Sequence, residues 1–206
     1  IDAHTLMNSF LVSAQSDGAV IVFRSEVTGI EPSGGTCEVQ VNDAEYRFRT
    51  RVLINCAGLY ADRIAALAGI DIEESGYRLK YCKGDYFSVS PSPKLSHLVY
   101  PVPQDGQVGL GVHATLDLAG RVRFGPDTEY VNEPAYAVDE TKGDAFWASV
   151  KRYLPGVRRE QIHPDTSGIR PKLQGPSEPY RDFVITEESG RGFPGLINLV
   201  GIESPG

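Results

Sequence analysis

One histidine stands in a sequence context that suits proton transfer. The chain contains four histidines, and His113 follows Gly111 and Val112 in a segment whose alternation predicts a strand. Because side chains two positions apart project to the same face of a strand, the imidazole borders the space that Gly111 leaves open. A neutral imidazole takes up protons near neutral pH, so this position predicts a general base. A core or surface histidine without a catalytic part is the alternative.

An arginine and a lysine suit the binding of an anion. Arg170 stands in Gly168-Ile169-Arg170-Pro171-Lys172, where the following proline restricts its backbone. A guanidinium group offers two parallel donors to a planar carboxylate, and Lys172 adds a second positive charge. The segment therefore predicts a rigid carboxylate clamp, with an arginine in a surface loop as the alternative.

Other motifs favour neither phosphate nor metal binding. Residues 109–114 and 190–195 have the glycine spacing of dinucleotide-binding loops, but neither precedes an expected helix whose N-terminus could hold a phosphate. No two histidines have the spacing of a pair of metal ligands. We therefore expect no metal site.

The composition limits the partners and the compartment of the protein. The chain of 206 residues is 41% hydrophobic and 23% charged, as globular proteins are, and its net charge of -7 argues against a nucleic-acid partner. No apolar run reaches about 18 residues, so we expect no transmembrane segment. Three cysteines without C-x-x-C spacing indicate reduced thiols and a cytoplasmic location.

The elements that must position these groups begin with a helix and a hairpin. Apolar spacing predicts a helix over 3–17 with one buried face, capped by Asp2 and ended by Gly18. A buried strand is expected over 19–23, continuing over 27–30. A hairpin with one wet face follows, because Cys37, Val39 and Val41 alternate with polar residues after the turn signal at 32–35.

A strand, a turn of small residues and a helix come next. Residues 51–55 form a mainly aliphatic run, as in a parallel strand covered on both faces, and lead through Ala57-Gly58 into an expected helix over 60–68. This is half of an α/β unit. Ligands of such sheets bind at the carboxyl ends of the strands.

The middle of the chain is rich in strand patterns, and α/β signals return near its end. A helix is expected over 141–153, and Asp105-Gly106 predicts a hairpin turn. The expected strands are 86–89, 98–100, 108–116, 122–124, 182–185 and 196–200. This interleaving predicts a mixed α/β (α+β) fold whose units are 1–75, 76–165 and 166–206. Because the chain opens at Ile1 and stops in a turn-like segment, we also expect a fragment of a longer protein.

Several segments together resemble a known family. They are Asn55-Cys56-Ala57-Gly58, Tyr100-Pro101-Val102-Pro103, Gly111-Val112-His113-Ala114-Thr115, Phe124-Gly125-Pro126 and Gly168-Ile169-Arg170-Pro171. The chain resembles the FAD-dependent oxidoreductases of the D-amino-acid oxidase superfamily, and within it most closely the L-2-hydroxyglutarate dehydrogenase/oxidase group. The resemblance implies a fragment of a Rossmann-like FAD-binding domain, interleaved with an antiparallel β-sheet domain that binds substrate.

The resemblance also implies an activity and a set of site residues. The activity is FAD-dependent oxidation of a small 2-hydroxy acid, L-2-hydroxyglutarate to 2-oxoglutarate, with hydride transfer to flavin N5 and either oxygen or a quinone as electron acceptor. His113 would be the base, and Arg170, Lys172 and Thr115 would bind the carboxylate substrate. The residues that would contact FAD are Val27, Ala57, Gly58, Gly201, Ile202, Ser204, Pro205 and Gly206.

The sequence departs from the family pattern in two places. The N-terminal strand with its G-x-G-x-x-G loop is absent, and Leu116 stands where many members have arginine. Arg121, Arg123 or Lys172 would then meet the second carboxylate of a dicarboxylic substrate. An amino-acid or amine oxidase acting on glycine, sarcosine or a D-amino acid stays an alternative, as does a catalytically inert truncated fragment. A peripheral protein at the inner membrane and a mitochondrial protein are the alternative locations.

Overall fold

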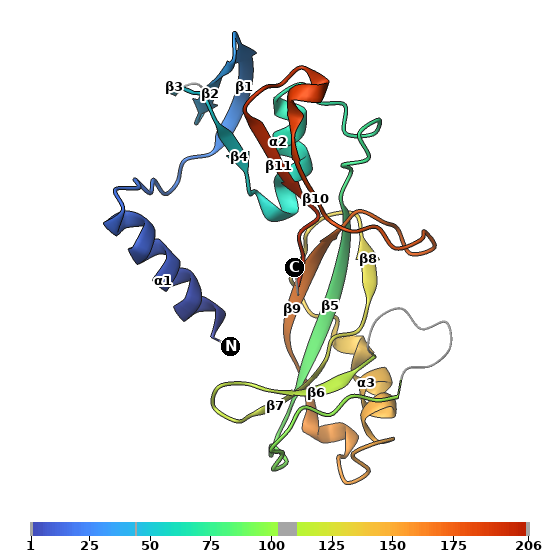
Figure 1. The fold of residues 1–206 in the computed structure, drawn as a ribbon. Helices are drawn as coiled ribbons and strands as arrows, with labels where there is room; N and C mark the ends of the chain where they lie inside the picture. The colour runs from blue at the N-terminus through green and yellow to red at the C-terminus, as the bar shows by residue number, and fades with distance from the viewer. Residues whose placement is uncertain (1, 44, 103–110, 205–206) are drawn as a thin grey trace.

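The computed structural model describes residues 2–43, 45–102 and 111–204, which form three sheets and three α-helices (Figure 1). The helices are α1 (Ala3–Ser16), α2 (Ala61–Leu67) and α3 (Gly143–Val150), with short 3-10 segments η1 (Gly58–Tyr60), η2 (Glu140–Lys142), η3 (Arg159–Gln161) and η4 (Glu188–Arg191). The strands are β1 (Val27–Ser33), β2 (Thr36–Val41), β3 (Tyr46–Thr50), β4 (Leu53–Asn55), β5 (Lys80–Val89), β6 (His113–Leu116), β7 (Val122–Gly125), β8 (Glu129–Val131), β9 (Ile162–Lys172), β10 (Val184–Glu187) and β11 (Leu196–Val200). No helix in these ranges is long and apolar enough to cross a membrane.

The first sheet is the antiparallel meander β1-β2-β3, and it confirms the predicted hairpin. Cys37, Val39 and Val41 are buried and alternate with half-buried polar residues, as the period of two requires. Gly34 and Gly35 make the turn with φ values of 56° and 82°, which L side chains rarely adopt.

The second sheet has the order β10-β11-β4, with β11 parallel to β4 and antiparallel to β10. Ala61 and Ala65 of α2 are buried in one core cluster with Leu196 and Val200 of β11. This confirms the predicted strand, turn and helix. The expectation that residues 51–55 are covered on both faces is wrong, because β4 lies at the edge of the sheet and Ile54 is exposed.

The third sheet is built around β5, the ten-residue strand at its centre. The strand β9 pairs antiparallel along β5 from Lys80 to Val89, while β7 and β8 pair with different parts of β5 and β6 pairs with β7. On this sheet α3 packs through Phe146, whose ring centroid lies 4.4 Å from that of Phe87. The mixed α/β fold with antiparallel sheets is as predicted.

The long strand β9 excludes the alternative of a surface loop around Arg170. Its sequence, with two prolines and several polar residues, lacks the alternation of a strand, so the pairing with β5 decides its conformation. The boundary expected between residues 165 and 166 lies within β9, and the division into domains stays a prediction. The short strand β8 was not expected either.

Two other strand predictions are wrong. Residues 19–23 form no strand and are exposed, with Phe23 76% exposed. Residues 98–100 make only an isolated bridge, between Val99 and Ala114. Apolar runs this short do not specify a pairing partner. The hairpin turn predicted at Asp105-Gly106 lies outside the described residues.

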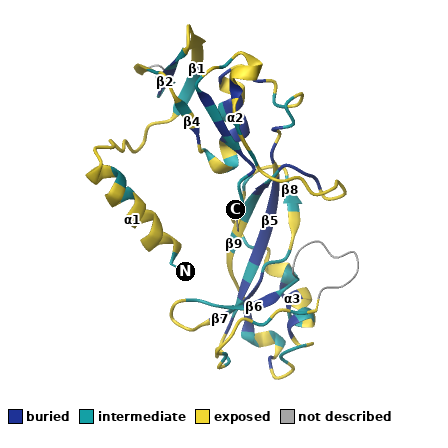
Figure 2. Ribbon diagram, viewed as in Figure 1, coloured by how far each residue is buried: buried dark blue, intermediate teal, exposed yellow. Residues whose placement is uncertain are grey.

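The first helix begins at the predicted residue and ends one residue earlier than predicted, but it lacks the predicted buried face. Asp2 caps it by accepting from the Thr5 amide at 3.1 Å, and Gly18 follows with a φ of 88°. Nevertheless no residue of α1 is buried, and Phe10 is 64% exposed (Figure 2). The apolar spacing therefore predicts the helix correctly, but it does not show whether another surface covers the apolar face.

The three cysteines are free and differ in accessibility. Cys37 of β2 and Cys82 of β5 are buried, whereas Cys56, directly after β4, is exposed. Burial raises the pKa of the Cys37 and Cys82 thiols.

Candidate active site

A cavity of about 1120 Å³ brings together most of the side chains predicted to bind or transform a substrate. It is bordered by β5, β6 and β9 and by the segment after β11. His113, Arg170 and Lys172 line it, together with Gly201, Ile202 and Ser204. A volume of this size is ample for a small-molecule site.

His113 is held in one tautomer within this cavity. The imidazole is buried, and its Nδ1 lies 3.0 Å from the carbonyl oxygen of Gly111. Because a carbonyl only accepts, Nδ1 carries the proton and Nε2 keeps its lone pair in the neutral ring. Burial lowers the pKa of His113, and the nearby charge of Arg170 lowers it further, against the opposing hydrogen bond to Gly111. The ring is therefore neutral at neutral pH and able to accept a proton.

Tyr100 fixes the plane of the same imidazole. The two rings stack with centroids 4.4 Å apart and an angle of 21° between their planes. Tyr100 also lines the cavity. Tyr100 belongs to a family motif, but the sequence predicts no role for it, because stacking on a residue 13 positions away leaves no local signal.

Arg170 and Lys172 project from the same side of β9, two positions apart, and meet one carboxylate of the chain. Arg170 Nη1 donates to Glu203 Oε2 at 3.2 Å and to the carbonyl oxygen of Ser204 at 2.9 Å. Lys172 Nζ donates to Glu203 Oε1 at 2.6 Å. Glu203 is not among the predicted site residues, because it comes from a segment more than 30 residues further along the chain.

Two other arginines expected as partners of a second carboxylate lie elsewhere. Arg121 pairs with Asp117 and Arg123 with Asp165, each at 2.7 Å, and neither lines the cavity. Arg181 does line it, and its guanidinium donates to the carbonyl oxygens of Leu173 and Gly76. Arg181 is not among the predicted site residues.

Two buried asparagines shape the carboxyl edge of the second sheet. Asn55 Nδ2 donates to Asn198 Oδ1 at 2.8 Å and to the carbonyl oxygen of Ala61 at 2.7 Å, while Asn55 Oδ1 accepts from the Ala57 amide at 3.2 Å. Since β4 and β11 are parallel, the turn at Ala57 and the segment beginning at Gly201 follow the same edge. Asn55 thus fixes the turn through its side chain.

The two glycines at this edge differ in the space beside them. Gly58 has a φ of 57°, and a Cβ built on it would meet no atom within 4 Å. Gly201 has a φ of 76°, and its Cβ would lie 2.8 Å from Leu173 Cγ. Glycine is required at Gly201 because both the conformation and the space exclude a side chain.

The remaining predicted site residues lie away from the cavity or outside the described part of the chain. Val27 begins β1, Ala57 and Gly58 lie in the turn after β4, and Thr115 donates to the Arg123 carbonyl at a long 3.5 Å; none of these four lines the cavity. Their assigned contacts stay predictions. Pro205 and Gly206 are outside the described residues.

A cluster of charges surrounds the buried Asp85 at the cavity wall. Asp85 has a fully buried side chain, and Lys142 Nζ lies 2.8 Å from Asp85 Oδ2, 2.8 Å from Asp127 Oδ2 and 2.7 Å from Glu129 Oε2. Burial alone would lower the pKa of Lys142, but the hydrogen bonds to these three carboxylates raise it. Lys83, which lines the cavity, donates to the Ala137 carbonyl and lies 3.2 Å from Asp85 Oδ1.

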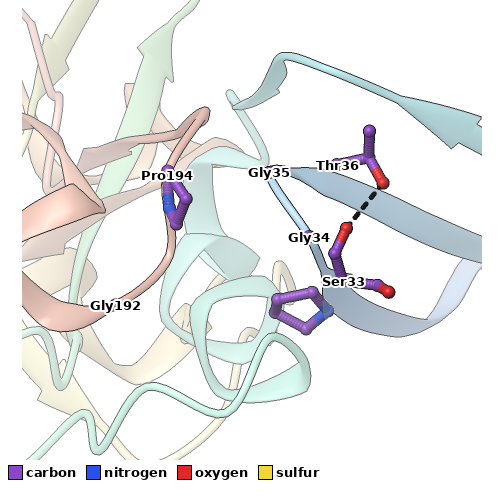
Figure 3. A pocket seen from close by; sticks show the side chains of 7 residues that line it. Ser33, Gly34, Gly35, Thr36, Gly192 and Pro194 are labelled. Atoms are coloured by element: carbon purple, nitrogen blue, oxygen red, sulfur yellow. Dashed lines mark hydrogen bonds between the residues drawn. The ribbon is translucent and has the colours of Figure 1, made fainter.

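A second, smaller hollow of about 170 Å³ lies between the turn of the first hairpin and Pro194 (Figure 3). Its lining is glycine, proline and two hydroxyl residues, of which Thr36 Oγ1 donates to the Ser33 carbonyl at 2.8 Å. It contains no titratable side chain. In the described ranges, no three His, Cys, Asp or Glu side chains are grouped so as to hold a metal ion.

Comparison with known proteins gives a consistent result. The family model described as FAD dependent oxidoreductase (DAO) matches residues 1–206. L-2-hydroxyglutarate dehydrogenase, mitochondrial, of Arabidopsis thaliana is 39% identical over 189 residues, which cover 84% of this chain and 38% of that protein. L-2-hydroxyglutarate dehydrogenase of Escherichia coli K12 is 35% identical over 116 residues, covering 55% of this chain and 26% of that protein.

A solved structure is similar over nearly the whole chain. L-alpha-glycerophosphate oxidase from Mycoplasma pneumoniae, reduced with dithionite and with FAD bound, superposes with a TM-score of 0.78 at 25% identity. The match covers 95% of this chain and 49% of that one. The chain therefore spans half or less of the length of these relatives.

Proposed function

Because the chain belongs to the FAD-dependent oxidoreductase family, whose model matches it from end to end, we propose that it serves the FAD-dependent oxidation of a small 2-hydroxy acid, L-2-hydroxyglutarate first among them. The family membership confirms the predicted resemblance. The observation that carries the proposed reaction is that one cavity contains both a neutral imidazole, His113, and a carboxylate-binding guanidinium, Arg170.

The residues present fit FAD. The large cavity borders the segment after β11, and the carboxyl edge of the parallel strands β4 and β11 is where nucleotide ligands of such sheets bind. Gly58, with open space beside it, and the backbone of Gly201 and Ile202 would hold the cofactor. When bound, FAD supplies the acceptor for the hydride that leaves the substrate.

Two side chains would act on the substrate, one by binding it and the other by accepting a proton. Arg170 would bind the carboxylate and so fix the position of the neighbouring carbon that bears the hydroxyl group. His113 Nε2, free because Nδ1 is bonded to Gly111, would take the hydroxyl proton. Tyr86 also lines the cavity; burial raises the pKa of its phenol, so at neutral pH it is a hydrogen-bond donor to an anion.

A glycerol phosphate is the second candidate substrate. The relative with a TM-score of 0.78 is an L-alpha-glycerophosphate oxidase, and a glycerol 3-phosphate dehydrogenase of Caloramator mitchellensis is 27% identical over 197 residues. Both substrates carry an alcohol near an anionic group, as a site with Arg170 and His113 requires. Oxidation of glycine has weaker support, since glycine oxidase of Bacillus cereus, at 17% identity, shares the fold alone.

Two measurements test the proposal. Purified chain is mixed with FAD and desalted, and its absorbance is recorded at about 450 nm, where bound flavin absorbs. Protein that stays colourless would favour the inert fragment. Flavin-containing protein is then assayed with L-2-hydroxyglutarate, glycerol 3-phosphate, glycine, sarcosine and D-alanine, in air and with a quinone analogue. Turnover of the amino acids without turnover of the hydroxy acid would contradict the proposal, and the acceptor that supports turnover would separate oxygen from quinone.

A further inference from the structure

A carboxylate of the chain itself lies between the two cations of the clamp. Glu203 accepts from Lys172 at 2.6 Å and from Arg170 at 3.2 Å. Its two oxygens are thus divided between the two side chains. The clamp is a set of three charges, two positive and one negative, with one net positive charge.

The two cations are not equally available to a ligand. The side chains of Lys172 and Glu203 are 17% and 19% exposed, whereas that of Arg170 is 43% exposed. Arg170 uses Nη1 for Glu203 and Ser204, and its Nε and Nη2 donate to no other group in the part of the chain that the structure describes. The remaining donors of Arg170 suffice for one bidentate carboxylate, while Lys172 is engaged by Glu203.

The other charges that line the cavity make no contact with Glu203. Lys83 is compensated by Asp85 at 3.2 Å, and Asp127 by Lys142 at 2.8 Å, whereas the guanidinium of Arg181 donates to the carbonyl oxygens of Leu173 and Gly76. In a site partly shielded from water, an uncompensated charge costs more than it does in solution, so ligand charge tends to be matched by protein charge. A clamp with one net positive charge therefore suits a ligand group with one negative charge.

We propose that Glu203 is a specificity-determining residue that limits the Arg170–Lys172 clamp to a singly charged group. This rests on the proposed function, since it takes Arg170 as the ligand of the substrate's carboxylate. Glu203 cancels the charge of Lys172. A phosphate dianion or the second carboxylate of a dicarboxylate therefore gains little binding free energy from Lys172. The distal carboxylate of L-2-hydroxyglutarate then lies outside the clamp, and a monocarboxylic hydroxy acid binds the clamp as well.

A purely structural part for Glu203 is the competing explanation, because the same contacts also tie the segment after β11 to β9. Glu203→Gln separates the two explanations, since glutamine keeps the size of the side chain and one acceptor oxygen but removes the charge. Lys172→Met in the Glu203→Gln background then removes the cation that was released.

The test uses two inert ligands that differ by one charge. Glutarate and pentanoate each have five carbons and no oxidisable hydroxyl group, so their dissociation constants can be measured by calorimetry on FAD-loaded protein without turnover. We expect Glu203→Gln to raise the affinity for glutarate relative to pentanoate about tenfold, and the double variant to return the ratio to that of the wild type. Glu31→Gln, the same substitution on β1 outside the cavity, is the matched control and should leave the ratio unchanged.

Each outcome supports or overturns the inference. Binding of both ligands with a ratio that moves less than twofold in Glu203→Gln, in protein with unchanged thermal unfolding, would overturn the part of Glu203 and leave the proposed function standing. A tenfold change that persists in the double variant would also overturn it, because Lys172 would not be the cation released. Failure of the wild type and of every variant to bind either carboxylate would overturn this inference and the proposed function together.

Discussion

The second and third sheets each bury one carboxylate completely, and they surround it in different ways. Glu188, in η4 beside the second sheet, accepts from Tyr77 Oη at 2.7 Å, from Asn198 Nδ2 at 2.9 Å and from Arg191 Nη1 at 2.8 Å. Asp85, on β5 of the third sheet, faces Lys142 through Oδ2 and Lys83 through Oδ1; the Oδ1 contact, at 3.2 Å, is an ion pair without a hydrogen bond, and Oδ1 has no other partner among the described residues.

The two carboxylates therefore differ in function: Glu188 stabilises the fold through hydrogen bonds, whereas Asp85 balances the positive charge of nearby lysines. The donors to Glu188 are mostly neutral groups, and Asn198 links it to Asn55 and the turn at the carboxyl edge. The partners of Asp85 are cations, and one of them, Lys83, lines the cavity. A buried acid satisfied by hydrogen bonds mainly stabilises the fold, whereas one balanced by ion pairs also sets the electrostatic potential of the site beside it.

Replacing Asp85 with alanine should have the largest effect. It removes a buried anion and leaves Lys83, whose side chain is 8% exposed, without a carboxylate, so we expect a loss of about 3–5 kcal/mol in the free energy of unfolding. Urea denaturation measures it. Asp127→Ala is the control, because Lys142 would keep Asp85 and Glu129; an equal loss in both variants would contradict a special part for Asp85.

Replacing His113 with asparagine directly tests the proton transfer proposed for this residue of the third sheet. Asparagine can still donate to the Gly111 carbonyl but cannot act as a base, so we expect kcat of the FAD-loaded enzyme to fall roughly 100-fold or more. His163→Asn, an exposed position of β9, is the control. An unchanged kcat in His113→Asn would exclude this histidine as the base.

Replacing Glu188 with glutamine should have a smaller effect that is confined to stability. Glutamine keeps an acceptor for Tyr77 but loses the charge paired with Arg191, so we expect a loss of about 1–2 kcal/mol in the free energy of unfolding. Carboxylate binding in the cavity should not change. Burial and Glu188 together raise the pKa of Tyr77 to about 12, so in Glu188→Gln the phenol should titrate at lower pH, measured by ultraviolet absorbance.

The pH dependence of stability should show the smallest effect. The pKa of His113 is lower in the folded chain than its ordinary value of 6.5, so the unfolded chain binds more protons in the interval between the two values. The stability from this residue is complete above pH 6.5 and is lost as the pH falls through that interval. Chemical unfolding of wild type and His113→Asn between pH 5 and 8 should show a slope that only the wild type has; parallel curves would contradict the lowered pKa.

Local sequence patterns predict elements whose own residues indicate the face that is buried. The alternation of β2 shows its buried face, and its partners β1 and β3 are its neighbours in sequence. The small residues of α2 mark the face that packs on β11, although the sequence does not identify that distant strand. The pattern of α1 gives its ends, since Asp2 and Gly18 act within one turn, but not its exposure. The strand β9 is missed because its pairing with β5, rather than its own polar sequence, makes it a strand.

The site is predictable in its chemistry and not in its charge balance. His113 and Arg170 are recognisable by residue type and neighbours, and the structure places both in one cavity. Glu203 and Lys142 are not, because each meets its partners from a distant segment; Lys142 and Asp85 are 57 positions apart. Single-residue propensity contains no information on such pairs.

Because only one of the three thiols is exposed, a dye can be attached at a single position of the unmodified chain. Since the thiolate is the reactive form, the buried Cys37 and Cys82, with raised pKa values, resist alkylation at neutral pH, and a maleimide dye modifies the exposed Cys56. That fluorophore sits next to Ala57-Gly58. The isoalloxazine ring of bound FAD would quench the emission of this dye. Adding FAD in steps would then give a binding curve on native protein, with no engineered cysteine.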